Sequence, residues 1–392
     1  MAIQGGVELM PWEKVKLGDV CESISDGDHL PPPKSVNGIP FVTISNVNSS
    51  NQFDFKNTMF VPQEYYEKLD EKRKPRINDI LYSVVGSFGI PVFIKENRPF
   101  VFQRHIAILR PNESRIHPRY LYYKMLSKDF YMKADAVAIG AAQRTISLTS
   151  LRNMEISIPC KDSQKRIADI LSAYDDLIEN NQKQIKLLEE AAQRLYKQWF
   201  IDLRYPGHET TPIVNGLPEG WRRDCVGNLI KKIERTKQIE AKDYLLEGKI
   251  PVIDQSRNFI AGYTDDLDSA VKESCPVIVF GDHTRILKYI QFPFAKGADG
   301  TQLIVSNIAC MPQSLFYCSL VNVDLSNYHY ARHFKYLKAE EIVVPDEQIA
   351  KKFDGVVSLL FNKIQTCRNQ ILFAQNSRDR LLSKIMNGEL EV

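Results

Sequence analysis

The chain has 392 residues, of which 44% are hydrophobic and 25% charged, and its 51 Lys and Arg residues against 48 Asp and Glu residues leave a formal net charge of +3. This ordinary globular composition excludes a collagen-like, low-complexity or largely disordered protein, and the length predicts two or three domains. No apolar run approaches the roughly 20 residues of a membrane span, and the amino-terminal residues lack the pattern of a signal peptide, so we expect a cytoplasmic protein. Seven scattered cysteines without a CxxC pair favour neither a disulfide framework nor a zinc site.

Residues 1–160 are predicted to form a first globular domain. Short apolar runs, such as those at 100–102 and 106–109, alternate with Pro, Gly and Asn turns. This pattern is typical of a mixed sheet accompanied by a few helices. Residues 117–135 are predicted to form one of those helices.

Residues 161–200 are predicted to form a long helix with apolar residues at alternating spacings of four and three. That spacing is typical of the a and d positions of a coiled coil, and Asn181 resembles the polar residue that sets the register of such a pair. An ordinary helical bundle is the alternative. The predicted seam consists of Ile167, Leu171, Tyr174, Ile178, Asn181, Ile185, Leu188, Leu195 and Trp199.

Residues 201–220 have Pro and Gly breaks and no periodicity, which predicts a linker. A second globular domain is expected over 221–345, followed by a second long helix over 346–392. The second predicted seam consists of Phe353, Val357, Leu360, Ile364, Ile371, Leu381 and Ile385. Arg378 stands where the first seam has Ala192, so we expect the helix pairing to weaken near that end.

The two halves of the chain repeat one plan. Trp12 followed by Leu-Gly-Asp-Val at 17–20 matches Trp221 followed by Val-Gly-Asn-Leu at 226–229, an offset of 209 residues. From Leu151 and Leu337 onward the offset is 186 residues and needs no gap for almost fifty residues. Because the two long stretches match position by position, we expect the two helices to pair with each other.

The chain lacks the short motifs that mark common enzymes. It has no GxxxxGK[ST] phosphate loop, no GxGxxG, HExxH or GxSxG pattern, and no FxGxG or [DN]PP[YF] motif of amino-methyltransferases. Its seven histidines show no metal-ligand spacing. These absences favour a binding protein over an enzyme.

Polar and basic residues gather in the predicted loops of both globular domains. Arg and Lys suit the guanine edge, Gln suits the adenine edge, and Thr is adaptable, so these loops are candidates for reading DNA. Each cluster can equally be a loop kept soluble by polar residues. The candidate DNA-contacting residues are Lys34, Gln103, Arg104, His105, Gln143, Arg144, Arg235, Lys237, Gln255, Arg257, His283, Arg285, Thr301 and Gln302.

Taken in order, these patterns resemble the specificity subunit of type I restriction–modification systems. The resemblance covers nearly the whole chain. It is carried by the two Trp-led openings, by Val-Phe-Gln-Arg-His-Ile-Ala-Ile-Leu-Arg-Pro at 101–111, and by residues 143–159 leading into Ser-Gln-Lys-Arg-Ile-Ala-Asp-Ile-Leu at 163–171. Each pattern is weak alone, but their order, given twice with a heptad helix after each copy, is specific.

The resemblance implies an α+β fold with a pseudo-twofold internal repeat. Two mixed α/β target-recognition domains would be separated by two long helices that form an antiparallel coiled coil. Each domain would read one half of a bipartite double-stranded DNA site. Two modification subunits would supply S-adenosylmethionine chemistry at adenine N6, and restriction subunits would supply ATP- and Mg-dependent translocation and cleavage, so this chain itself would be non-catalytic and hold no cofactor or metal.

The lengths of the elements agree with that arrangement. Residues 167–199 span about 50 Å as a helix, more than the roughly 34–36 Å of one DNA turn. The two copies differ in every candidate loop, which predicts an asymmetric site and not a palindrome.

Three alternatives stay open at this point. One is the specificity chain of a related bipartite-site system, either one that cuts on both sides of its site or one that acts with a methyltransferase only. Another is a self-contained DNA-cleaving enzyme that uses Asp79, Asp282 or Asp299. The third is a coiled-coil scaffold without a DNA function.

Overall fold

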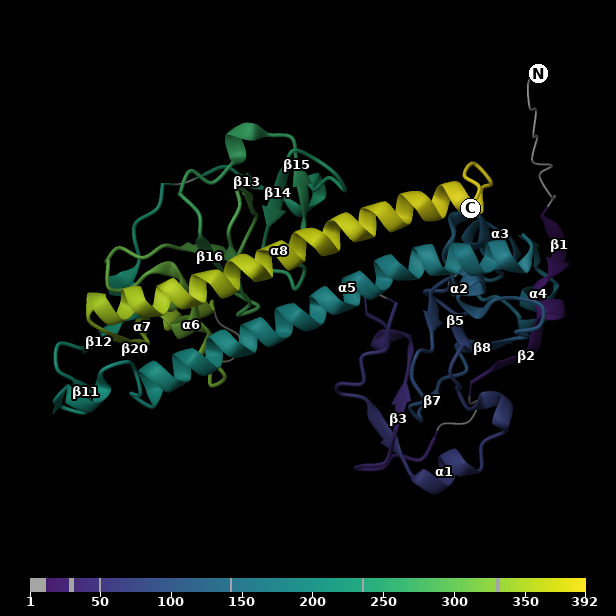
Figure 1. Cartoon of the computed structure of the whole chain (residues 1–392), viewed down its shortest axis with the longest axis horizontal. Helices are drawn as coiled ribbons and strands as arrows, with labels where there is room; N and C mark the ends of the chain where they lie inside the picture. Colours follow the sequence, from purple (N-terminus) through teal and green to yellow (C-terminus); the bar gives the residue numbers. More distant parts are fainter. Residues whose placement is uncertain (1–11, 28–31, 49–50, 142, 235, 329–331) are drawn as a thin grey trace, which may run out of the picture. The chain divides into compact units, whose positions relative to one another are not determined.

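The computed structural model describes residues 12–27, 32–48, 51–141, 143–234, 236–328 and 332–392. The chain divides into two compact units, the first built from 1–179 with 372–392 and the second from 180–371. Each unit therefore combines one globular region with parts of both long helices, α5 (Lys161–Tyr196) and α8 (Glu347–Met386) (Figure 1). Among the described residues, no helix is long and apolar enough to cross a bilayer.

The first unit contains two small sheets and a strand pair. The larger sheet is antiparallel throughout and has the order β2 (Cys21–Asp26), β8 (Ile106–Pro111), β5 (Ile80–Ser83) and β6 (Pro91–Phe93). In the second sheet, a central strand pairs antiparallel on one side and parallel on the other: β4 (Met59–Val61), β3 (Ile39–Val42) and β7 (Val101–Phe102). The strand pair joins β1 (Glu13–Lys16) to β9 (Glu155–Ile158).

The second unit repeats these pairings. Its antiparallel sheet has the order β17 (Leu287–Ile290), β16 (Val277–Gly281) and β19 (Thr301–Ile304). The other sheet has the order β13 (Gln238–Ile239), β18 (Ala295–Gly297), β14 (Ile250–Ile253) and β15 (Gly262–Thr264), with β14 antiparallel to β15 and parallel to β18. The strand pair joins β12 (Arg222–Cys225) to β20 (Glu341–Val344). By pairing and order, β5, β6 and β8 thus correspond to β16, β17 and β19.

In the Trp-led opening of each copy, the glycine lies close to the backbone of a short helix, which leaves little room for a side chain. In the first unit a Cβ on Gly18 would lie 3.2 Å from the carbonyl oxygen of Arg152, in helix α4 (Leu148–Asn153). In the second unit a Cβ on Gly227 would lie 3.0 Å from the carbonyl oxygen of Lys338, in helix α7 (His333–Ala339). The repeated sequence motif therefore marks a repeated contact between a turn and a short helix.

Short helices accompany the sheets. The first unit contains α1 (Gln63–Glu67), α2 (Pro118–Leu126) and α3 (Lys128–Val137), and the second contains α6 (Gln313–Val321). The single helix predicted over 117–135 is wrong in one respect, because it breaks at Ser127. The Ser127 side chain accepts a hydrogen bond from the backbone nitrogen of Phe130 and so begins a new helix.

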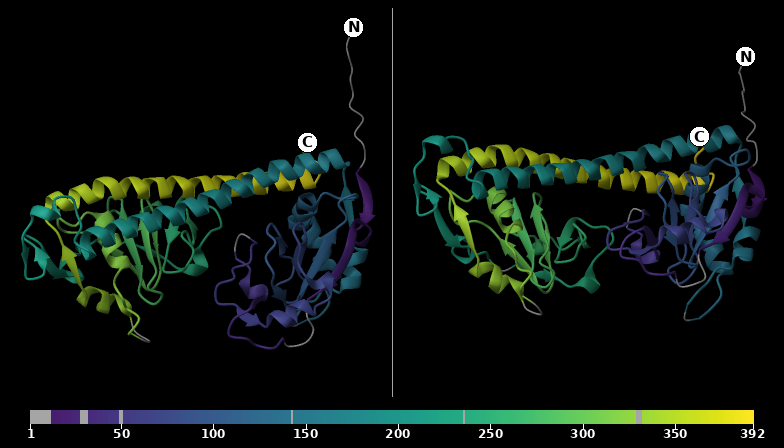
Figure 2. Two further views of the ribbon diagram at one scale, coloured as in Figure 1. Left: turned by 60° about the horizontal axis from the view of Figure 1, so that its bottom comes forward. Right: turned by 90° about the horizontal axis from the view of Figure 1, so that it is seen from below.

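The two long helices pack against each other inside each unit, as both views in Figure 2 show. In the first unit the start of α5 contributes Ile167 and Leu171 to the same hydrophobic core as Ile385 near the end of α8. In the second unit the π-helical turn that continues α5 (Lys197–Ile201) contributes Trp199 to the same core as Phe353 near the start of α8. The helices are therefore antiparallel where they meet.

Arg378 does not weaken the pairing as the sequence suggested. Its guanidinium lies 2.6 Å from the Asp175 carboxylate on the other long helix, and its side chain is 20% exposed. The Asp175 carboxylate also accepts a hydrogen bond of 2.6 Å from the Tyr123 hydroxyl. An ion pair thus replaces apolar packing at this level of the first unit.

The segment 201–220 contains more structure than a bare linker. It forms a two-stranded hairpin of β10 (Ile213–Val214) and β11 (Leu217–Pro218). Tyr205 is buried and packs on Trp221 at 4.7 Å between ring centroids, inside the aromatic core of the second unit. The aromatic side chains of this segment and of the second opening motif are therefore part of one core.

Candidate nucleic-acid interface

Three loops of the second unit meet at one edge of its antiparallel sheet. One loop follows β14, one follows β16, and one precedes β19. Gln255, in the first loop, forms hydrogen bonds with the other two. Its side-chain amide donates to the carbonyl oxygen of Asp299 at 3.0 Å and accepts from the backbone nitrogen of His283 at 3.1 Å. Its backbone carbonyl accepts from the Thr284 hydroxyl at 2.7 Å. We call residues 254–258, 281–285 and 298–301 the second-unit loop cluster.

A buried lysine fixes the first of these loops from below. Lys288 is 4% exposed, and its ammonium donates to the backbone carbonyl oxygens of Asp254, at 2.7 Å, and of Asn258. Burial lowers the pKa of Lys288 to about 8, while the charge of Asp254 acts in the opposite direction. The loop that includes Arg257 is thereby tied at both ends.

The loop cluster presents some predicted residues to solvent and buries another. Arg257, His283 and Arg285 are exposed, but one nitrogen of the Arg285 guanidinium donates to the carbonyl oxygen of Leu325 at 2.9 Å. Thr301 is 1% exposed and lies inside the sheet, where it begins β19. Among the predicted residues of this cluster, Arg257 and His283 are therefore the most open to a ligand.

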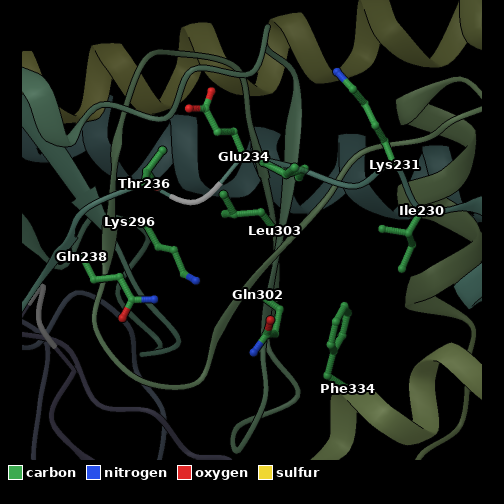
Figure 3. Close-up of a pocket in the computed structure, with 10 residues that line it drawn as sticks. Ile230, Lys231, Glu234, Thr236, Gln238, Lys296, Gln302, Leu303 and Phe334 are labelled. Carbon is green, nitrogen blue, oxygen red and sulfur yellow. The ribbon is translucent and has the colours of Figure 1, made fainter.

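Beside the cluster lies a pocket of about 460 Å³ between the 230–238 segment, β18, β19 and α7. Figure 3 shows Gln238, Lys296 and Gln302 directed into this space. Burial lowers the pKa of Lys296. Only Gln302 of these three was predicted, because Gln238 and Lys296 lie in short strands that carry no loop signal in the sequence.

Two further predicted residues belong to this segment. Lys237 is exposed, and its ammonium lies 2.6 Å from the Asp266 carboxylate. Arg235 lies outside the described residues.

The first unit places its predicted residues at the corresponding edge of its own sheet. The turn of Gln103, Arg104 and His105 precedes β8, and the carbonyl oxygen of His105 accepts from the backbone nitrogen of Val84, just after β5. Arg104 is exposed, whereas Gln103 and His105 are half-buried. Burial, followed by the nearby charge of Arg104, lowers the pKa of His105.

The segment around Arg144 reaches the same edge. The carbonyl oxygen of Val84 accepts from the backbone nitrogen of Ile146, so the two predicted segments lie on either side of one strand end. The Arg144 guanidinium pairs with Asp135 and lies 5.5 Å from the centroid of the Phe88 ring, which in turn stacks on Tyr131. Phe88 and Tyr131 form an aromatic platform that the sequence analysis did not identify.

Two other predicted residues of the first unit are exposed. Gln143 lies in the loop before Arg144, and Lys34 lies in the loop before β3. No hydrogen bond or ion pair brings Lys34 to the other predicted residues within the described parts of the chain.

Two of the three carboxylates considered as nuclease candidates are buried and have structural partners. Asp79 is 1% exposed and pairs with Arg110 at 2.9 Å. Asp282 is 4% exposed and accepts from the backbone nitrogen of Phe334 at 2.8 Å, at the start of α7. Asp299 is exposed in the loop cluster. Over the described residues, no three His, Cys, Asp or Glu side chains gather as metal ligands would.

All the predicted seam residues are buried or half-buried in the unit to which they belong. Ile167, Leu171 and Ile178 of α5 are almost fully buried in the first unit. Asn181 is 2% exposed in the second unit, and its side-chain nitrogen has no hydrogen-bond partner among the described residues. Gln164 of α5, which was not predicted, is also buried, and its side-chain oxygen accepts from the backbone nitrogen of His117 at 2.8 Å.

Comparison with known proteins finds similarity to one family. The family model for the type I restriction modification DNA specificity domain matches residues 10–190, which hold the first globular region and most of α5. The chain is similar to this family over that range. It is 26% identical over 299 residues to the type I restriction enzyme MjaIX specificity subunit of Methanocaldococcus jannaschii, covering 70% of this chain and 69% of that one. It is 28% identical over 202 residues to the HindI specificity subunit of Haemophilus influenzae, covering 50% of this chain and 42% of that one.

One solved structure has a similar fold. The crystal structure of the type I restriction–modification S subunit from M. genitalium matches with a TM-score of 0.61 and 17% sequence identity, covering 96% of both chains. The mixed α/β fold expected from the resemblance is thereby confirmed.

Proposed function

We propose that this chain is the non-catalytic specificity subunit of a type I restriction–modification complex and that each unit contacts one half of an asymmetric bipartite DNA site. One observation carries the proposal: both units gather polar and basic loop residues at the corresponding sheet edge. That edge is the end of β5 and start of β8 in one unit, and the end of β16 and start of β19 in the other. Two domains that recognise two different DNA half-sites are expected to use the same surface of one fold with different side chains.

The two edges differ in chemistry. The first presents an aromatic platform of Phe88 and Tyr131 with Arg144 bound to Asp135. The second presents Arg257 and His283 on a loop cluster tied together by Gln255. Two surfaces so unlike each other are suited to two different half-sites, which supports an asymmetric site.

The long helices would serve as the spacer, as an antiparallel coiled coil, and as the docking scaffold. Their seams are buried, yet several apolar side chains on their outer faces are exposed, among them Leu187 at 64%, Leu359 at 65% and Phe373 at 71%. Exposed apolar side chains on well-packed helices are typical of a surface that another protein covers. We assign this surface to two modification subunits, with restriction subunits completing the complex.

The chemistry of the complex would come from those partners. S-adenosylmethionine for adenine N6 methylation, and ATP with Mg for translocation and cleavage, would be bound by the modification and restriction subunits. A related system with a methyltransferase partner alone would use the same surfaces. Neighbouring reading frames distinguish the two.

The proposal is tested by co-expressing the chain with its neighbouring methyltransferase subunit and sequencing modified bases. Exchanging residues 254–258 for the corresponding loop of another family member should change one half of the methylated sequence and leave the other half unchanged. A change in both halves, or in neither, would contradict the assignment of one half-site to each unit.

A further inference from the structure

The two units carry different side chains at corresponding positions of the long helices. Applying the 186-residue offset, Asp175 on α5 corresponds to Phe361 on α8, and Arg378 on α8 corresponds to Ala192 on α5. In the first unit Asp175 and Arg378 form an ion pair of 2.6 Å between the helices. In the second unit Phe361 and Ala192 are 3% and 0% exposed in the hydrophobic core.

A tyrosine contacts the same position in both units. Tyr123 of α2 donates its hydroxyl proton to Asp175 at 2.6 Å. Tyr317, on the corresponding helix α6, places its ring 5.5 Å from the Phe361 ring in an edge-to-face arrangement. The corresponding sites are therefore built alike and differ in whether the contact is polar or apolar.

A second interhelical ion pair exists in the second unit. The Arg368 guanidinium of α8 lies 3.1 Å from the Glu189 carboxylate of α5. The side chains are 23% and 44% exposed. By the same offset these residues correspond to Gln182 and Gln375, which are uncharged.

In both pairs the acid is on α5 and the base is on α8. Two copies of α5 paired with each other in the same geometry would set Asp175 against Ala192 and Glu189 against Gln182. Two copies of α8 would set Arg378 against Phe361 and Arg368 against Gln375. Each like pair removes the interhelical ion pairs, although Asp175 keeps the Tyr123 hydroxyl and Arg378 keeps Asp379. Losing the interhelical partner of a half-buried charge disfavours the like pair.

We propose that these two ion pairs select the partner of each long helix. They favour pairing of a first half with a second half over pairing of two first halves or of two second halves. The selection is needed because the two halves share one fold and one heptad pattern, which favours pairing of either half with its own copy. The apolar contacts of the seam supply affinity for any of these pairings, and the ion pairs distinguish between them. This inference is independent of what the units bind.

The experiment uses the full chain with a protease site inserted between Asn215 and Gly216, both exposed in the β10–β11 turn. The purified protein is cleaved, the fragments are separated in denaturant and refolded together, and native mass spectrometry counts the pairings. Wild type should give first-half with second-half pairs at least about tenfold in excess of like pairs, since each like pair loses both interhelical ion pairs. Like pairs at their statistical proportion would overturn the proposal.

The matched variant gives each unit the residues of the other. Asp175→Phe and Arg378→Ala copy the apolar contact, and Glu189→Gln with Arg368→Gln copy the uncharged one. This four-residue variant should fold, because each replacement already exists at the corresponding site, and its fraction of like pairs should rise about tenfold or more. A variant that folds and still forms unlike pairs exclusively would contradict the role of the ion pairs.

If the four-residue variant fails to fold, a charge-exchanged variant tests the same proposal. It carries Asp175→Arg, Arg378→Asp, Glu189→Arg and Arg368→Glu, and it keeps both ion pairs with the charges reversed. Mixed with cleaved wild type, its halves should pair with each other and not with wild-type halves, which would set like charges together. Free mixing of all four halves would overturn the proposal.

Discussion

The Lys288 ammonium lies 2.7 Å from the backbone carbonyl oxygen of Asp254 and also binds that of Asn258, so one buried side chain closes the loop that carries Arg257. The position of the exposed arginine thus depends on a residue that no ligand could touch. A residue of this kind affects recognition through the shape of the loop.

Replacing Lys288 by Met should loosen the loop. Two backbone carbonyl oxygens lose a charged donor, so we expect a loss of about 1–3 kcal/mol in the free energy of unfolding and faster hydrogen exchange over 254–258. Urea denaturation and hydrogen-exchange mass spectrometry measure both. Lys272→Met is the control, because Lys272 is exposed and pairs with Glu234 at 3.1 Å on the surface. Equal effects of the two substitutions would contradict the account.

Titration of Lys288 should also make the stability of the chain depend on pH. The pKa of Lys288 is about 8 in the folded chain and returns to its ordinary value of 10.5 on unfolding. Between these values the unfolded chain binds more protons, so stability rises with pH, by a few kcal/mol at most from this group. Because other groups titrate in this range, the measured quantity is the difference between wild type and Lys288→Met at pH 7.5 and 9.5. A difference that stays constant or falls as pH rises would show that Lys288 does not titrate this way.

Arg257→Ala should alter recognition at one half-site. Arg257 is exposed on the loop that Lys288 fixes, and loss of a base contact relaxes the preference at that base pair by about 1–3 kcal/mol. Competition binding with single-base variants of the methylated sequence measures this. Arg223→Ala, an exposed arginine on β12 of the same unit, should leave base preference unchanged. A uniform loss of affinity for all sequences would instead identify Arg257 as a phosphate contact.

Adjacent leucines on α5 should behave differently. Leu188 is half-buried against the core of the second unit, so Leu188→Asp should cost about 2–4 kcal/mol of stability. Leu187 is 64% exposed, and Leu187→Asp should change stability by less than about 0.5 kcal/mol. Thermal unfolding of both variants tests the orientation of the helix. Similar losses in the two variants would show that the seam is not where the structure places it.

Phe373→Ser should weaken docking of the modification subunit without destabilising the chain. Its ring is 71% exposed on α8, so folding gains little from it, whereas a partner that covers it would gain its burial. Pull-down or calorimetry with the methyltransferase subunit measures the loss of affinity, expected at about tenfold. Ile213→Ser, an exposed apolar residue of β10, is the control. Unchanged affinity in Phe373→Ser would remove this surface from the proposed interface.

The sequence predicted the long helices well because their signal is periodic and local. Every predicted seam position, from Ile167 to Ile385, is buried or half-buried in the structure. The break at Ser127 was missed because a serine cap inside an apolar run is a weak signal against a continuing helical pattern. Arg378 was misjudged because its partner, Asp175, lies 203 residues away in the chain.

The candidate interface was predictable only loop by loop. Polar composition identified the loops of Gln255 and His283, but the hydrogen bond between them depends on which strands are neighbours. Lys288 gave no signal, since a lysine within a strand reads as a solvent-facing residue until its burial is known. Tyr205 was likewise assigned to a linker, although its ring packs in a core formed by distant segments.

The most direct test of the central claim is long-read sequencing of modified bases in cells that co-express this chain with its neighbouring methyltransferase subunit. The account predicts a new N6-methyladenine motif that is split in two and asymmetric, and it predicts that Arg257→Ala changes only one of the two parts. A palindromic or unbroken motif would contradict the assignment of a different half-site to each unit. No motif from a soluble, fully assembled complex would contradict the proposed function itself.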